Sequence, residues 1–236
     1  MLSTGRAGWR RAGFELVIVF LGVLVALLVD GWNEGRIERA VERDYLQRIL
    51  EDVREDRREL SALTKALDSK RDAIVRLLSP THFESMSDLE LLQTLVEAST
   101  AGFGVLSGNS TTFEDLRGTG NLGLVSDPEL RAEIVSYYES WRFNAERVEA
   151  RRSSLPPDVY ALLPSSAFST DVFFDAPADS VPSNFSRSAV VAFLGSQSGR
   201  SELRGESNYA RFFRGVVRDL DEQAEQLSNA VRPGSD

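Results

Sequence analysis

The chain has 236 residues and a formal net charge of −9, from 36 acidic and 27 basic side chains. This acidic balance argues against nucleic-acid binding, which needs a basic face. The absence of cysteine excludes disulfides, thiolate catalysis and cysteine-ligated metals. The single histidine, His82, is expected in a loop next to Pro80, so no serine–histidine–acid set is credible. We therefore expect a protein without enzymatic activity, cofactor or metal.

An apolar segment near the N-terminus predicts a transmembrane helix over residues 12–32. Twelve of the fourteen residues in Leu16–Val29 are Leu, Ile, Phe or Val, and together they favour insertion by about 4–7 kcal/mol. Glu15 opposes insertion by at most about 3 kcal/mol, and by less because it lies at the edge of the apolar run. Trp9 and Trp32 would lie about 35 Å apart along the helix, at the two interfaces of a bilayer.

Two other interpretations of this segment stay open, namely a cleaved signal peptide and a buried helix of a soluble protein. Arg10 and Arg11 before the apolar run fit a signal peptide. The membrane interpretation is favoured because the run is long for a signal peptide and is followed by bulky Trp32. The cations in residues 1–11 predict a cytoplasmic N-terminal tail, a span of the bacterial inner membrane and a periplasmic remainder. The candidate membrane-interface residues are Trp9, Arg10, Arg11, Glu15 and Trp32.

The rest of the chain, residues 33–231, predicts an all-α fold with three long helices and several short ones. Residues 33–79 are expected to form one long helix whose seam positions alternate in spacing between three and four, which is a heptad pattern. The seam comprises Leu46, Ile49, Val53, Asp56, Leu60, Leu63, Leu67, Lys70, Ile74 and Leu77. The other helices are expected at about 88–98, 111–117, 126–155, 187–194 and 201–231. An irregular connection is expected at 156–185, and a loose tail at 232–236.

These helices cannot bury their apolar stripes alone, so we expect one transmembrane helix that leads into an antiparallel helical bundle. Whether the transmembrane helix and the first bundle helix are continuous stays open, with Gly31 and Gly35 as candidate bends. Asp56 and Lys70 interrupt the apolar seam of the first bundle helix. A polar seam residue costs stability and can fix helix register or select a partner. The two either pair with a neighbouring helix or lie where the seam meets water.

Three other patterns resemble functional motifs but have simpler explanations. Residues 118–123 (GTGNLG) match the dinucleotide-binding fingerprint, but a helix and not a strand precedes them, which predicts a glycine-rich turn. The acids between residues 51 and 59 would need histidine partners to hold two metals, so we expect a solvated face. Tyr137, Tyr138 and Trp141 are expected to pack in the core, with a ligand pocket as the less favoured alternative.

Two blocks of sequence together resemble a known family. The first contains Glu15-Leu16-Val17, Gly22, Leu24, Ala26, Trp32-Asn33-Glu34, Tyr45-Leu46, Asp52 and Asp56. The second contains Thr112-Phe113, Leu116, Gly120, Leu122, Leu124, Leu130-Arg131 and Tyr137-Tyr138. They resemble an uncharacterised bacterial single-pass membrane protein family, catalogued as a domain of unknown function. The resemblance covers about residues 15–60 and 110–140. It implies a bacterial origin and an uncleaved membrane segment, but no activity or ligand.

The expected role is protein–protein interaction, as a scaffold or as an accessory subunit of a larger membrane assembly. The expected partners are the lipid bilayer and one or more proteins, either of a larger membrane complex or further copies of this chain, but not nucleic acid. The main alternative is an extracytoplasmic ligand-sensing bundle that signals through a partner's transmembrane helix. A third possibility is an enzyme or transport component that uses Glu15.

Overall fold

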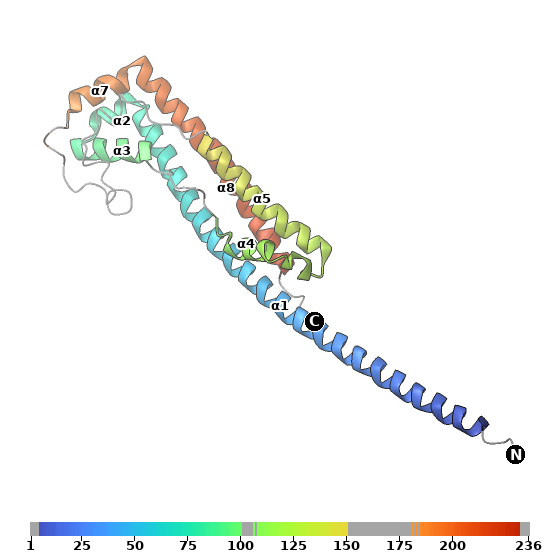
Figure 1. Cartoon of the computed structure of the whole chain (residues 1–236). Coiled ribbons are helices and arrows are strands. Elements are labelled where there is room, and N and C mark those ends of the chain that lie inside the picture. Colours follow the sequence, from blue (N-terminus) through green and yellow to red (C-terminus); the bar gives the residue numbers. More distant parts are fainter. Residues whose placement is uncertain are drawn as a thin grey trace.

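The computed structural model describes residues 5–100, 106, 108–150, 181, 183 and 185–231. Within these residues the fold is all helical and contains no strand, as the sequence predicts (Figure 1). The elements in chain order are α1 (Gly5–Leu77), α2 (Pro80–Ser85), α3 (Asp88–Thr100), α4 (Thr111–Gly118), the 3-10 helix η1 (Asn121–Leu124), α5 (Pro128–Ala150), α7 (Arg187–Gly195) and α8 (Gln197–Val231).

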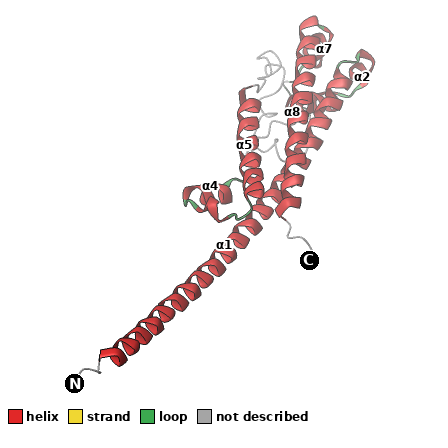
Figure 2. Cartoon of the chain, turned by 90° about the vertical axis from the view of Figure 1, so that its right-hand side faces the viewer, coloured by secondary structure: helices red, strands yellow, loops and turns green. Residues whose placement is uncertain are grey.

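The first helix, α1, is continuous over 73 residues and is therefore about 110 Å long. It joins the predicted membrane segment to the first bundle helix without a break at Gly31 or Gly35. Figures 1 and 2 show its N-terminal part projecting from the bundle as a single rod. In contrast to the expected transmembrane helix over 12–32, no helix in the described part of the chain is long and apolar enough to cross a membrane.

The three long helices differ in direction. On α1 and α8 the ion pairs Arg57–Asp221 and Asp68–Arg214 show that the two helices are antiparallel. Contacts of Glu42 with Ser126 and of Asp56 with Tyr137 follow the same order along both segments, so α5 is parallel to α1. The expected antiparallel arrangement is thus confirmed for α1 with α8 and is wrong for α1 with α5.

The reason for the parallel pair is the path between α3 and α5. Ser99, at the end of α3, contacts Lys70 of α1, and Asn109 contacts Asp56. Asp115 of α4 then contacts Tyr45, and Ser126 contacts Glu42. The chain therefore runs back along α1 toward the base of the bundle before α5 begins, and α5 starts in the same direction as α1.

The interior is divided into two apolar cores. The proximal core lies nearer the projecting part of α1 and combines side chains of α1, α4, α5 and α8. The distal core combines the end of α1 with α2, α3, α7 and Leu203 of α8. Every predicted seam residue from Ile49 to Leu77 is buried, and only Leu46 is half-buried. The heptad prediction for the first bundle helix is therefore confirmed.

Most of the predicted helices are confirmed, and two short helices are additional. The sequence treats Pro80 as the end of a helix, whereas Pro80 begins α2, because proline fits the first helical turn. The glycine-rich turn at 118–123 overlaps with η1 (Asn121–Leu124), and Gly120 adopts a left-handed φ of 74° there. Most of the predicted connection 156–185 lies outside the described residues, as does the tail 232–236.

Candidate functional site

The first candidate position is Asp56, a carboxylate inside the proximal core that is 2% exposed. Its Oδ1 atom accepts a hydrogen bond of 2.7 Å from the backbone N–H of Asn109. Its Oδ2 atom accepts another of 2.7 Å from the hydroxyl of Tyr137. Burial raises the pKa of Asp56, and the hydrogen bonds from Tyr137 and Asn109 oppose this shift. Asp56 thus connects α1 with α5 and with the segment before α4.

Gly108 explains why the Asn109 N–H can reach this carboxylate. Gly108 has a φ of +55°, a conformation that favours glycine. A Cβ atom at this position would also lie 2.7 Å from the ring of Trp141. The sequence analysis expected a loop here but missed its role. The adjacent Gly108 and Asn109 could have indicated a tight turn here, although they stand in the reverse order of the common Asn-Gly turn.

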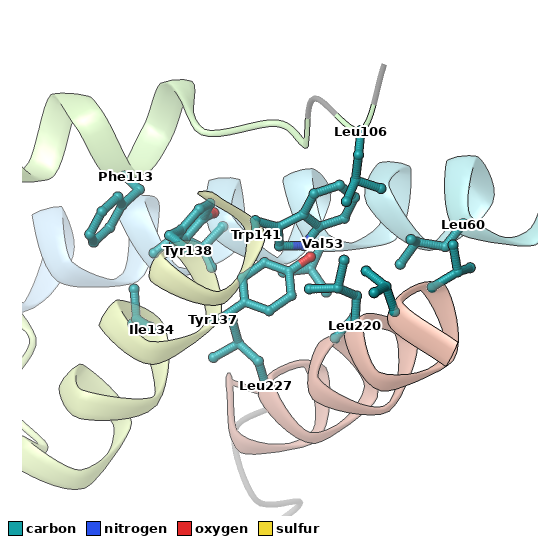
Figure 3. Packing of buried hydrophobic residues seen from close by; sticks show 14 of the residues in the cluster. Val53, Leu60, Leu106, Phe113, Ile134, Tyr137, Tyr138, Trp141, Leu220 and Leu227 are labelled. Carbon is teal, nitrogen blue, oxygen red and sulfur yellow. The ribbon is translucent and has the colours of Figure 1, made fainter. Parts of the chain in front are cut away.

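The predicted aromatic cluster lies in the proximal core (Figure 3). Tyr138 stacks on Phe113 with ring centroids 4.5 Å apart, and Tyr137 contacts Tyr138 and Trp141 edge-on at 5.1 and 6.4 Å. Burial raises the pKa of both tyrosines, and the Asp56 carboxylate raises that of Tyr137 further. The three residues are almost completely buried against other side chains, as the core-packing interpretation predicts. A ligand pocket at this place stays a prediction.

The second candidate position is Lys70, which is also buried and not at the edge of the seam. Its Nζ atom lies 2.8 Å from Glu206 Oε2 of α8, and the two side chains are 1% and 4% exposed. Nζ also donates a hydrogen bond of 3.1 Å to the backbone carbonyl oxygen of Ser99 in α3. Burial lowers the pKa of Lys70, and the charge of Glu206 opposes this shift. Lys70 therefore connects α1 with both α3 and α8.

Lys70, Glu206 and Ser99 form a polar layer between the two apolar cores. On α1, Leu67 belongs to the proximal core and Ala73 to the distal core. On α8, Ala210 belongs to the proximal core and Leu203 to the distal core. If α8 moved along α1 by one helical repeat, each charge would face apolar side chains, which is costly. The layer therefore favours one register, as a polar seam residue does in a coiled coil.

The third candidate region is the apolar segment of α1. The described large apolar side chains between Leu16 and Trp32 are 43% to 72% exposed. The guanidinium of Arg36 lies over the Trp32 ring, 5.8 Å from its centroid. The predicted interface residues Trp9, Arg10, Arg11 and Glu15 belong to α1 by their backbone, but their side chains lie outside the described part.

The other sequence motifs form no further site in the described part of the chain. His82, expected in a loop, lies in α2. Among the described residues, no group of three or more histidine or carboxylate side chains is arranged to hold a metal.

Comparison with protein-family models, curated proteins and solved structures gives no match to this chain. The resemblance to a bacterial membrane family therefore stays a prediction. The two blocks that carry it do contact each other. Tyr45 and Asp56 of the first block contact Asp115 and Tyr137, which lie in the span of the second.

The raised pKa of Asp56 predicts a pH dependence of stability. The folded chain binds the Asp56 proton at higher pH than the unfolded chain. The stabilisation of the fold by protonated Asp56 is therefore full below the ordinary pKa of 3.8. It is lost as the pH rises through the folded-state value. We expect the free energy of unfolding of the wild type, relative to Asp56→Asn, to increase as the pH falls from about 7 to about 4. Urea unfolding followed by circular dichroism measures this difference. A difference that is constant or decreases on acidification would contradict the assignment.

The polar layer predicts strong coupling between Lys70 and Glu206. Glu206→Leu leaves a buried ammonium group without its counter-charge and should lower the free energy of unfolding by about 3–5 kcal/mol. Adding Lys70→Met should recover most of this loss, because a well-packed apolar pair avoids the desolvation cost of the charges. Urea unfolding of wild type, both single variants and the double variant gives the coupling energy. Additive effects would show that the two side chains do not act as a pair.

Proposed function

We propose that the protein is a single-pass membrane protein whose helical bundle acts in protein–protein interaction, without enzymatic activity. The exposed apolar segment of α1 is the main observation behind this proposal. Successive residues of an α-helix are about 100° apart, so the eleven positions 19–29 cover every face of the helix. An apolar surface on all faces needs complete burial. A bilayer covers all faces at once, whereas the described residues of the bundle cover none of this segment.

The length of the segment agrees with this proposal. Leu16–Val29 spans about 20 Å, and residues 12–32 span about 30 Å, the thickness of the hydrocarbon core. Trp32 is exposed at one end of this span, where tryptophan favours the membrane interface. The side chains of Val17 and Ile18, which are apolar in the sequence, lie outside the described part and add to the apolar run.

The continuity of α1 supports a scaffold or accessory role. Residues 36–40 are exposed, Val41 packs against the proximal core, and Glu42 next to it accepts hydrogen bonds from Ser126. The base of the bundle is therefore about 15 Å beyond Trp32 along the helix axis. A single rigid helix would hold the bundle at a fixed height and angle above the membrane, where it can meet a partner in the same membrane. We propose the bacterial inner membrane with the bundle in the periplasm, from the cations of residues 1–11.

The alternative role as a ligand sensor depends on a pocket at Tyr137, Tyr138 and Trp141. The close ring contacts and burial of these side chains do not favour it. Interaction with another protein is the proposal that needs no such pocket.

Two charges within the apolar segment should abolish membrane anchoring. Leu24→Arg with Val25→Arg costs about 6–8 kcal/mol at the centre of a transmembrane helix. This cost offsets the whole gain of about 4–7 kcal/mol from the apolar run. We expect the wild type to stay in the membrane fraction after carbonate washing and the double variant to be released.

Val75→Arg is the matched control, because Val75 is an exposed apolar residue of α1 within the bundle. It should remain in the membrane fraction. Cross-linking in native membranes, followed by purification in mild detergent, tests the interaction role of the retained proteins. Release of the wild type by carbonate would contradict the anchor, and a strictly monomeric particle without a partner would contradict the interaction role.

A further inference from the structure

The stem, which we define as residues 30–43 of α1, has six of its seven charged residues on two roughly opposite sides, and the seventh, Glu42, lies between them and accepts hydrogen bonds from Ser126. Arg36, Arg39 and Arg43 lie within about 60° of the helix circumference, at 100° per residue, and Trp32 shares this side. We name these three arginines the basic stripe. Asp30, Glu34 and Glu38 lie on roughly the opposite side, and we name them the acidic stripe. All six charged side chains are exposed.

The two stripes do not neutralise each other within the chain. Among the described residues, none of the six forms an ion pair. The polar contacts of the basic stripe are a hydrogen bond of 3.2 Å from Arg43 Nε to the carbonyl oxygen of Arg39, and the position of Arg36 over the Trp32 ring. A solvated helix usually places opposite charges four residues apart. Here Arg39 and Arg43 place like charges four residues apart, and so do successive acids of the acidic stripe. Repulsion between these like charges disfavours the isolated helix. An external partner for the basic stripe would remove this cost.

We propose that the basic stripe binds the phosphate groups of anionic phospholipids next to the membrane segment. This inference rests on the proposed membrane anchor and names the ligand that the stem meets there. Arg36 and Arg39 are about 6 and 10 Å beyond Trp32 along the axis. The headgroup layer on each side of the hydrocarbon core is about 5–7 Å thick. Arginine side chains are long and extend toward the interface, and a guanidinium binds phosphate through two parallel hydrogen bonds.

The charge arrangement also determines a direction of tilt. A stem that leans toward its basic stripe brings Arg36 and Arg39 among the phosphates and lifts Glu34 and Glu38 away from them. Because the bundle is joined to the stem by one continuous helix, its orientation would follow this tilt. Phosphate layers lie on both sides of a bilayer, so the contact does not depend on which side the bundle occupies.

A single fluorophore on the stem can test this proposal in the full chain. The protein has no cysteine, so Ala40→Cys, an exposed position of the stem, gives one labelling site. The labelled chain is placed in phosphatidylcholine vesicles with and without phosphatidylglycerol, and an environment-sensitive dye on Cys reports headgroup contact. We expect the anionic lipid to shift the emission toward that of a less polar environment, and added salt to reverse the shift.

The two stripes supply matched variants. Each arginine close to an anionic surface contributes about fivefold to binding, so the loss of Arg36 and Arg39 in R36Q/R39Q/R43Q should weaken the bound state at least about twenty-fivefold and abolish the shift. D30N/E34Q/E38Q changes the same number of charges and should keep the shift or increase it. An equal response of wild type and R36Q/R39Q/R43Q, or an equal loss in both triple variants, would overturn the proposal.

Two further measurements separate other ligands and the anchor itself. Inorganic phosphate added to phosphatidylcholine vesicles should not reproduce the shift, and if it does, a free phosphate is the ligand and the lipid proposal is overturned. Labelled copies of the chain are also checked for energy transfer between them. If such transfer occurs and either triple variant abolishes it, the stripes bind a second copy of the chain and the lipid proposal is overturned. Every variant should resist carbonate extraction. Release of the wild type would contradict the membrane anchor, whereas retention with no lipid-dependent shift would contradict the basic-stripe proposal alone.

Discussion

The continuity of α1 is the constraint on which the rest of the structure depends. One helix carries the exposed apolar segment, the charged stem and the seam around which both cores are built. The bundle is built on its C-terminal half, which packs against α2, α3, α4 and α8, so the projecting N-terminal half and the bundle cannot be oriented independently without bending it (Figure 1). An apolar segment at one end of such a rod therefore determines how the whole bundle is presented.

The buried polar groups explain how the bundle keeps one arrangement around this rod. Asp56 binds Asn109 and Tyr137, and Lys70 binds Glu206 and Ser99, so each of these two buried residues connects α1 with two other segments. Leucine at both positions would bury more apolar surface but would accept several registers. The proximal core, which Asp56 stabilises, lies nearest the stem. A change in the tilt of the stem would therefore act on this core before the distal one.

The heptad seam of α1 was predictable because it depends on local periodicity, and its buried residues from Ile49 to Leu77 agree with the expectation. Glu206 was missed, although it occupies a seam position of α8 between Leu203 and Ala210 and its charge complements Lys70. Which seam positions meet depends on the register of helices far apart in the sequence, and no local pattern encodes it. The contact of Asp56 with a backbone N–H and the direction of α5 depend on the return path before α4, which the residue pattern does not specify either.

The most direct test of this account is the distance between the apolar segment and the bundle along α1. Spin labels on Ala26→Cys and Ala62→Cys, both exposed positions in a chain without other cysteines, should be about 54 Å apart if the helix is continuous. Pulsed electron paramagnetic resonance of the protein in lipid nanodiscs measures this distance. We predict a single narrow distribution near that value. A broad distribution, or a mean below about 45 Å, would show a bend at the stem and contradict the account.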